Sequence, residues 1–207
     1  VALAQDRDLL VVEDDPYGQL RFEGEALPTL HSLDATGRVL YVGTLSKVFS
    51  PGVRVGWVHA PHPILHRVNL AKQGADLCGS PLNQLLSLAY LRHPRRQEVI
   101  ERLRRLYAAR RDAMLEAIGE ALPDAIVTRP AGGLFLWATL PAQVDTTDLL
   151  AAALERNVAF VPGVNAFVDG RSGASSMRLN FSACEEERIV EGVRRIGQVV
   201  QERARLA

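Results

Sequence analysis

Three short runs of apolar residues, each bounded by polar or turn-forming residues, limit most strongly what this chain can fold into. They are Leu9–Val12, Val39–Gly43 and Val53–Val58, the last interrupted by one arginine. A run that is apolar at almost every position is typical of a strand buried on both faces, as in a parallel sheet between helix layers. Such sheets bind ligands at the carboxyl ends of their strands. The sequence therefore predicts an α/β fold with its functional site at that edge.

Helical periodicity follows the third run and predicts how the chain is divided. The predicted helices are residues 63–76, 81–93 and 95–122. The longest of them has apolar residues near helical spacing and ends at Pro123, which cannot continue a helix. A helix of this length suits a connection between two domains. We predict three parts: residues 1–98 in a large domain, residues 99–122 as a connecting helix, and residues 123–207 as a small domain.

Short strands and helices alternate after Pro123, which indicates an α+β arrangement for the small domain. The predicted strands are residues 126–128, 133–138, 158–163 and 177–181, of which the first two form a hairpin. A helix over residues 149–155 follows the capping residues Asp145–Asp148. Ser182 is predicted to cap the last helix, whose first turn is acidic.

Charge and cysteine content exclude several kinds of partner. The chain has 24 basic and 24 acidic residues and a formal net charge of zero, so no overall field attracts nucleic acid or an anionic membrane. No apolar run approaches the about 20 residues of a membrane span. Cys78 and Cys184 fit no metal or redox spacing, so we expect buried free thiols and a cytoplasmic location.

Two further clusters are interpreted as surface features. The histidines His59, His62 and His66 flank prolines at a strand-to-helix junction, and we expect no metal site there. Seven arginines lie among acidic residues on the predicted long helix, a pattern typical of a solvated helix face. They are Arg95, Arg96, Arg102, Arg104, Arg105, Arg110 and Arg111.

Lys47 follows the second apolar run and is the first candidate for chemistry. A single lysine is usually a solvated surface group. Here Ser46 precedes the lysine, Pro51–Arg54 follow it, and a predicted buried strand leads to it. An amine at the mouth of an apolar sheet can be desolvated and can then form imines with carbonyl groups.

Asp14 and Tyr17 follow the first apolar run, at the same predicted edge of the sheet. One interpretation is a simple turn, because Asp-Asp-Pro is good turn chemistry. Alternatively, a carboxylate can keep a pyridine nitrogen protonated, and a phenol can hydrogen-bond an oxygen of the same ring. Asp15 could serve the turn, which would leave Asp14 available.

Arg54 lies seven residues after Lys47 in a strand predicted to be mostly buried. A buried guanidinium needs an anion, and its planar fork suits phosphate. Thr44 and Ser46 add hydroxyl donors nearby. The alternative is an internal salt bridge between Arg54 and a carboxylate of the protein.

The motifs taken together resemble a known family. EDDPY at 13–17, TLSK at 44–47 and PGVRVGW at 51–57 resemble the signature of class I/II, fold-type I, pyridoxal-phosphate-dependent aminotransferases. LAKQGADL at 70–77, PAGGLFLW at 130–137 and SMRLNF at 176–181 are similar to the 2-aminoadipate and kynurenine aminotransferase branch. The resemblance covers essentially all 207 residues. It implies the C-terminal part of a large domain with a mixed, mostly parallel sheet, followed by a small α+β domain.

The resemblance also implies roles for individual residues. Lys47 would hold pyridoxal 5'-phosphate as an imine, Asp14 would pair with the pyridine nitrogen, and Tyr17 would contact the 3-oxygen. The phosphate would be held by Thr44, Ser46 and Arg54. Arg178 would bind the substrate α-carboxylate, and its apolar strand neighbours predict a buried anion partner; an internal ion pair is the alternative. The implied activity moves an amino group between an amino acid and a 2-oxo acid in a homodimer.

The main departure from the family lies upstream. The chain begins at Val1 without an initiator Met, a signal-peptide pattern or a helix cap, so we expect a fragment that starts within a helix. Family members carry an upstream half with a phosphate cradle, a ring stacked on the cofactor and an asparagine near its 3-oxygen. We therefore expect weak cofactor binding and negligible turnover from these 207 residues alone.

Other functions stay open. The same lysine occurs in aminotransferase-like sensor domains of winged-helix transcription regulators, although LAKQGADL favours the enzyme branch. A carbon–sulfur lyase or an acyl-transferring synthase would keep the cofactor and change the reaction. The sequence does not specify the amino donor.

Overall fold

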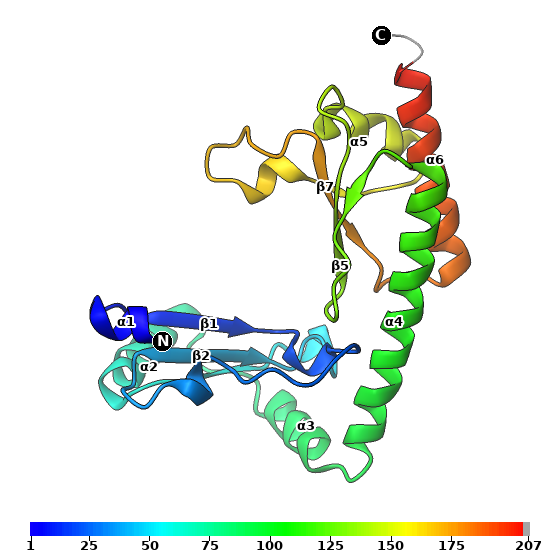
Figure 1. Ribbon diagram of the computed structural model, residues 1–207. Helices are drawn as coiled ribbons and strands as arrows, with labels where there is room; N and C mark the ends of the chain where they lie inside the picture. The colour runs from blue at the N-terminus through cyan, green and yellow to red at the C-terminus, as the bar shows by residue number, and fades with distance from the viewer. Residues whose placement is uncertain (205–207) are drawn as a thin grey trace. The chain divides into compact units, whose positions relative to one another are not determined.

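The computed structural model describes residues 1–204 and has a mixed α/β architecture, which confirms the predicted fold class at that level. The chain forms two compact units, Val1–Leu103 and Arg104–Ala207. The long helix α4 (Arg96–Ala121) begins in the first unit and ends in the second (Figure 1). Within the described residues, no helix is both long enough and apolar enough to cross a bilayer.

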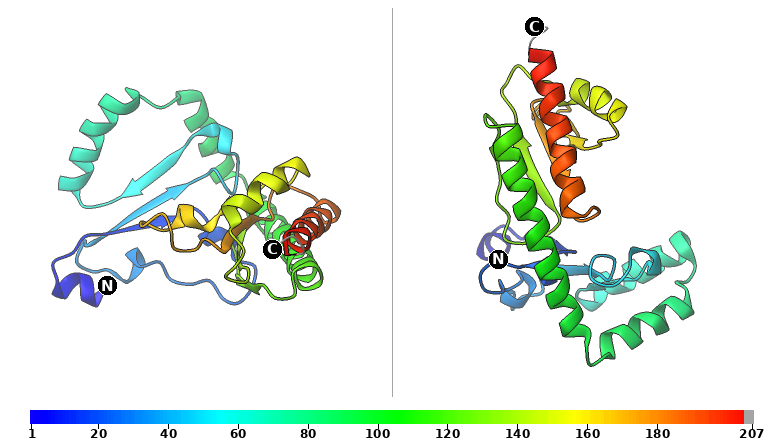
Figure 2. Two further views of the ribbon diagram at one scale, coloured as in Figure 1. Left: turned by 90° about the horizontal axis from the view of Figure 1, so that it is seen from above. Right: turned by 90° about the vertical axis from the view of Figure 1, so that its right-hand side faces the viewer.

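The first unit contains a three-stranded sheet. Its strands are β1 (Val11–Asp15), β2 (Val39–Thr44) and β3 (Gly56–His59), in the order β1-β2-β3. β1 and β2 are parallel, whereas β2 and β3 are antiparallel (Figure 2). The ends of β1 and β2 and the beginning of β3 therefore lie at one edge of the sheet, as predicted for the first two runs.

The predicted burial of these strands on both faces is wrong for two of them. Exposure alternates along β1, and Val12 is 63% exposed. Most of β3 is exposed. The third apolar run also does not begin as a strand, because Pro51–Val53 form the 3-10 turn η3 and Arg54 then takes a left-handed conformation with φ of 52°. Proline at the first position of a helical turn fits its fixed φ, so the strand starts only at Gly56.

The first unit also contains helical segments outside the sheet. They are α1 (Ala2–Asp6), η1 (Gly18–Leu20), η2 (His31–Leu33), α2 (His62–Asp76) and α3 (Pro81–Arg92). The last two confirm the predicted helices. The Ser80 hydroxyl accepts a hydrogen bond from the Asn83 amide and caps α3, whose first residue is proline. The Glu13 carboxylate accepts hydrogen bonds from the amides of Leu30 and His31, which holds η2 on one face of the sheet.

The second unit contains a four-stranded antiparallel sheet. Its strands are β4 (Ile126–Val127), β5 (Phe135–Thr139), β6 (Val161–Pro162) and β7 (Ser176–Asn180), in the order β4-β5-β7-β6. The predicted hairpin is confirmed by the β4–β5 pairing. Leu136 and Ala138 lie opposite Leu179 and Met177 and are all buried. α4 and α6 (Glu186–Ala204) lie side by side along this sheet (Figures 1 and 2).

Helix α5 (Thr146–Glu155) begins earlier than the predicted start at residue 149. The predicted cap is confirmed, because the Asp145 side chain accepts hydrogen bonds from the amides of Thr147 and Asp148. The predicted cap at Ser182 is wrong. α6 begins only at Glu186, and the Ser182 amide and hydroxyl instead donate to Oδ1 of Asn180. Ser182 thus closes the turn that follows β7.

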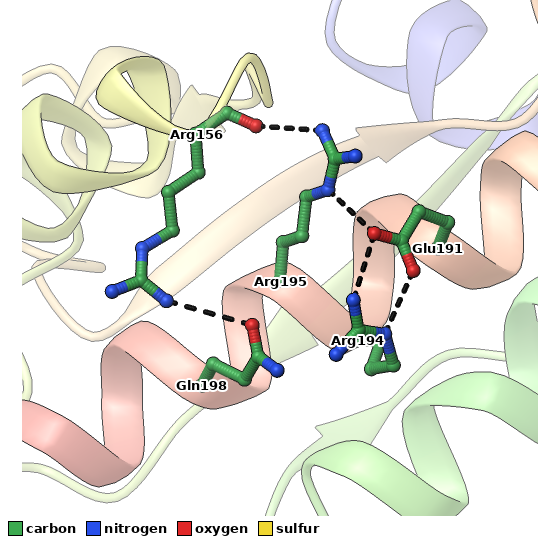
Figure 3. Close-up of polar contacts among 5 residues, drawn as sticks. All are labelled: Arg156, Glu191, Arg194, Arg195 and Gln198. Carbon is green, nitrogen blue, oxygen red and sulfur yellow. Dashed lines mark hydrogen bonds and ion pairs between the residues drawn. The ribbon is translucent and has the colours of Figure 1, made fainter.

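Helix α6 is tied to the end of α5 by arginines (Figure 3). Nη1 of Arg195 donates to the carbonyl oxygen of Arg156 at 2.9 Å, and Arg156 in turn reaches Oε1 of Gln198 at 3.5 Å. Glu191 accepts hydrogen bonds from Arg194 and Arg195, which lower the pKa of its carboxyl to about 2. Most of these bonds are partly buried, and together they hold α6 against the end of α5.

Two predictions of burial are also corrected. Arg111, predicted to lie on a solvated helix face, is only 1% exposed. Its guanidinium donates to Oδ1 of Asp112 and, at 2.8 Å, to the carbonyl oxygen of Pro130. These hydrogen bonds offset the free energy lost when the charged group leaves water. Both thiols are free, but Cys78 is exposed, so its predicted burial is wrong.

Candidate active site

The predicted catalytic lysine, Lys47, lies in a turn directly after β2. The Leu45 amide donates to the carbonyl oxygen of Val55 at 3.2 Å, which joins the beginning of this turn to the segment before β3. The Leu45 carbonyl oxygen then accepts from the amides of Phe49 and Ser50. The Lys47 side chain is half-buried, and no described residue forms an ion pair or hydrogen bond with its ammonium group. Its amine is therefore not held by any carboxylate in the described part of the chain.

The three residues predicted to hold a phosphate line one shallow recess of about 420 Å³ at this edge. The Thr44 hydroxyl lies 3.0 Å from the Ser46 hydroxyl and 3.2 Å from the carbonyl oxygen of Val55. It also accepts a hydrogen bond from the Ser46 amide at 3.1 Å. Arg54 lines the recess as well, so two residues with hydroxyl groups and one arginine border a single recess.

The prediction that Arg54 lies in a mostly buried strand is wrong. Its left-handed backbone places the residue between η3 and β3, and its side chain is exposed rather than buried. Nη1 donates to the carbonyl oxygen of Pro51 at 3.2 Å. No described carboxylate pairs with Arg54, so the alternative of an internal salt bridge fails. A guanidinium carries five N–H donors, and most of them remain for an external anion.

At the end of β1, neighbouring aspartates point to opposite faces of the sheet. Asp15 serves the turn: its Oδ1 accepts from the Gly18 amide at 2.6 Å and its Oδ2 from the Tyr41 hydroxyl at 2.9 Å. Burial, followed by this bond to Asp15, raises the pKa of Tyr41 to about 12. Asp14 is exposed and has no partner among the described residues, as expected if Asp15 takes the turn role. Tyr17 is half-buried and directly precedes η1.

Gly43 has a structural role that the sequence interpretation missed. It pairs with Trp57 across β2 and β3, and a Cβ at this position would lie 2.4 Å from the Trp57 ring. The indole therefore needs glycine beneath it. A glycine inside a strand is the available sequence signal, because it often marks such a close approach.

Arg178 belongs to the second unit, and the prediction that its side chain is buried is also wrong. It alternates with the buried residues Met177 and Leu179, so its side chain lies on the other face of β7 and is exposed. Its guanidinium carbon lies 4.5 Å from the centroid of the Phe135 ring. Together with Val161, these two residues line a cavity of about 190 Å³. No described carboxylate pairs with Arg178, so the internal ion pair is not observed.

A larger cavity of about 290 Å³ lies elsewhere in the second unit, between α4, β7 and α6. None of the predicted site residues lines it. In the described part of the chain, no group of three or more His, Cys, Asp or Glu side chains could hold a metal ion.

An α/β fold with a recess of hydroxyls and a guanidinium at one sheet edge is typical of proteins that hold a small anionic ligand. The family model for aminotransferase class I and II matches residues 1–196. The chain therefore belongs to the class I and II aminotransferase family.

Individual relatives agree with this assignment. Aromatic-amino-acid aminotransferase 1 of Thermococcus litoralis is 41% identical over 97% of this chain and 48% of that protein. The crystal structure of LysN, an α-aminoadipate aminotransferase from Thermus thermophilus complexed with N-(5'-phosphopyridoxyl)-L-leucine, is similar with a TM-score of 0.94 and 40% identity, over 100% of this chain and 54% of that chain. The uncharacterized HTH-type transcriptional regulator YisV of Bacillus subtilis is 32% identical over 88% of this chain and 37% of that protein. The chain spans about half the length of the aminotransferases it matches.

Proposed function

We propose that these residues belong to a pyridoxal-phosphate-dependent aminotransferase, which moves an amino group between an amino acid and a 2-oxo acid. The observation that carries the proposal is the meeting of three separate chain segments at one sheet edge. They are the end of β1 with Asp14, the turn after β2 with Lys47, and the approach to β3 with Arg54. Family membership supports the same activity.

The residues at this edge fit the chemistry of the cofactor. The recess offers Thr44, Ser46 and Arg54 as hydrogen-bond donors for a phosphate. Among the described residues, the Asp14 carboxylate has no partner and suits a protonated pyridine nitrogen, and the Lys47 amine has no partner either. Because no described side chain neutralises these groups, they are available to a ligand.

The mechanism follows from what each side chain can do. Pyridoxal phosphate, when bound, supplies a carbonyl group that condenses with amines and a ring that withdraws electrons from the substrate Cα. Asp14 would keep the ring nitrogen protonated, and the Tyr17 hydroxyl would donate to the ring 3-oxygen. Lys47 would hold the cofactor covalently. Its amine, when free, would serve as the general base that accepts the substrate Cα proton.

Arg178 is proposed to bind the substrate α-carboxylate. A planar guanidinium can grip a carboxylate through two parallel hydrogen bonds. Its exposure and its lack of a described carboxylate partner support this role. Phe135 lies close to the guanidinium and limits its freedom, which reduces the entropy lost on binding.

For the amino donor we propose a 2-aminoadipate, aromatic or branched-chain amino acid. The names of the T. litoralis and T. thermophilus relatives support the first two of these classes.

We further propose residues 1–98 as the C-terminal part of a large cofactor-binding domain, 99–122 as a connecting helix and 123–207 as a small domain. A cytoplasmic homodimer completes the proposal, supported by the free cysteines and by exposed leucines of α3 such as Leu82 and Leu85.

A second candidate function is a sensor domain of a transcription regulator. The similarity to YisV is the observation that favours it. The two functions differ in what the complete protein does with a 2-oxo acid and an amino acid. Transamination of added 2-oxoglutarate supports the enzyme, whereas cofactor binding with sequence-specific DNA binding and no turnover supports the regulator.

The decisive experiment uses the lysines. This chain has only two, Lys47 and Lys72, and Lys72 is already paired with Asp76 at 2.6 Å. In the complete protein loaded with pyridoxal phosphate, Lys47→Ala should abolish the visible absorption band of the covalently held cofactor, and Lys72→Ala should leave it unchanged. Borohydride reduction followed by peptide mass mapping should place the label on Lys47. A band that persists in Lys47→Ala would assign the covalent link to another residue.

A further inference from the structure

Tyr90, near the end of α3, contacts the turn that carries Lys47 in two ways. Its hydroxyl donates to the carbonyl oxygen of Val48, the residue directly after Lys47, at 2.8 Å. Its ring stacks on Phe49 with centroids 4.4 Å apart and planes 15° from parallel. The hydrogen bonds within the turn use the Leu45 carbonyl oxygen, not that of Val48. Tyr90 therefore holds the turn through contacts that the turn's own hydrogen bonds do not provide.

Arg96, at the first residue of α4, extends this contact to the segment after β1. Nη2 of Arg96 donates to Oε1 of Gln19 at 2.6 Å, and Gln19 lies in η1, two residues after Tyr17. Burial raises the pKa of the Tyr90 phenol, and the nearby Arg96 guanidinium opposes this rise. Hydrogen bonds thus join Tyr90 to Val48 and Arg96 to Gln19, and the Arg96 guanidinium interacts electrostatically with the Tyr90 phenol; all four residues belong to the first unit.

This chain of contacts joins the two segments that carry proposed cofactor-binding residues. Tyr17 and Gln19 belong to the segment after β1, and Lys47 and Val48 belong to the turn after β2. The sheet fixes the strands, but both segments lie beyond the last paired residues of β1 and β2. Their relative position therefore depends on contacts outside the sheet.

We propose that Tyr90 and Arg96 are positioning residues that hold the Lys47 turn at a fixed distance from the Tyr17–Gln19 segment. The inference rests on the proposed function, because it concerns the geometry around Lys47. Reacting groups must be placed to within about 1 Å for full efficiency, so a small displacement of the turn should alter the cofactor's environment. The role assigned to both side chains is to act through the Lys47 turn and not by contact with the cofactor.

The test uses the complete protein and pyridoxal phosphate itself. Tyr90→Phe keeps the ring that stacks on Phe49 and removes only the hydroxyl. Tyr107→Phe is the matched control, because the Tyr107 hydroxyl has no hydrogen bond within the described residues. Three quantities are measured: the affinity of the cofactor-free protein for pyridoxal phosphate, the pH midpoint of its visible absorption band, and the thermal unfolding temperature without cofactor.

We expect Tyr90→Phe to weaken cofactor affinity about 5- to 10-fold and to shift the pH midpoint of the band, with an unfolding temperature close to that of the unmodified protein. Tyr107→Phe should change none of these. Arg96→Met should weaken cofactor affinity by a similar factor. The double variant Tyr90→Phe/Arg96→Met should bind the cofactor no more weakly than the weaker-binding single variant, because both substitutions break the same link between the two segments.

Two outcomes overturn the inference. One is an unchanged affinity and pH midpoint in Tyr90→Phe. The other is additive losses in the double variant, which would mean that the two residues act separately. Failure of the proposed function gives a different result, because the unmodified protein would then show no band that depends on Lys47.

Discussion

Helices α4 and α6 approach each other closely at Gly197, and this contact yields a sharp prediction for stability. A Cβ at position 197 would lie 2.6 Å from the carbonyl oxygen of Ala121 and 2.9 Å from its Cβ. Carbon–oxygen contacts are comfortable at about 3.3–3.6 Å, so Gly197→Ala forces the helices apart by about 0.7 Å. The nearest atom belongs to the backbone, which cannot rotate away.

Two effects of opposite sign set the magnitude. Replacing a mid-helix glycine by alanine stabilises a helix by about 1 kcal/mol. Overpacking of a close contact typically costs about 1–3 kcal/mol. Gly192 lies in the same helix, and a Cβ there would meet nothing within 4 Å. Gly192→Ala should therefore raise the free energy of unfolding, and Gly197→Ala should fall below it by about 1–3 kcal/mol.

Urea unfolding followed by circular dichroism measures this difference, provided that the slope with denaturant is the same for both variants. Gly119→Ala is a second control, because Gly119 is in α4 and its Cβ would also meet nothing within 4 Å. If Gly197→Ala is as stable as Gly192→Ala, the close contact between α4 and α6 does not limit packing, and the reasoning is refuted.

Two further predictions concern hydrogen bonds away from the candidate site. Thr146 is fully buried, and its hydroxyl lies 2.9 Å from the carbonyl oxygen of Ala174 and 2.7 Å from that of Ser176. Thr146→Val should lower the free energy of unfolding by about 1–3 kcal/mol and Thr146→Ser by less, as measured by urea unfolding; equal losses would contradict the role of the hydroxyl. Tyr41 has a pKa raised from 10.0 to about 12, so the folded state keeps a proton that the unfolded state releases, and stability should fall as pH rises through this range. Tyr41→Phe should remove that part of the decline, and an identical pH dependence in both proteins would count against it.

Much of the architecture followed from the sequence because it depends on local patterns. Pro81 and the polar cap at Asp145 each act within one helical turn. The helix at Pro81 begins where predicted, and Asp145 is the predicted cap of its helix. The apolar run that starts at Val39 became the central strand of its sheet. The family motifs are also local, and the family assignment they implied was confirmed.

The sequence was less informative about burial and about which of two neighbouring residues faces the site. Apolar neighbours made Arg178 look buried, yet strand alternation turns its side chain away from Met177 and Leu179. Arg111 looked solvated among other charges, yet the carbonyl oxygen of Pro130 accepts from it inside the unit.

Local sequence therefore determined the elements, the motifs and the family, since each depends on residues a few positions apart. Tertiary structure alone decided the environment of the key side chains. The division of labour between Asp14 and Asp15 illustrates the reason: only the folded sheet brings Tyr41 to Asp15 and leaves Asp14 unpaired among the described residues. Burial and hydrogen bonding depend on what packs across from a residue, and those partners lie far away in the sequence.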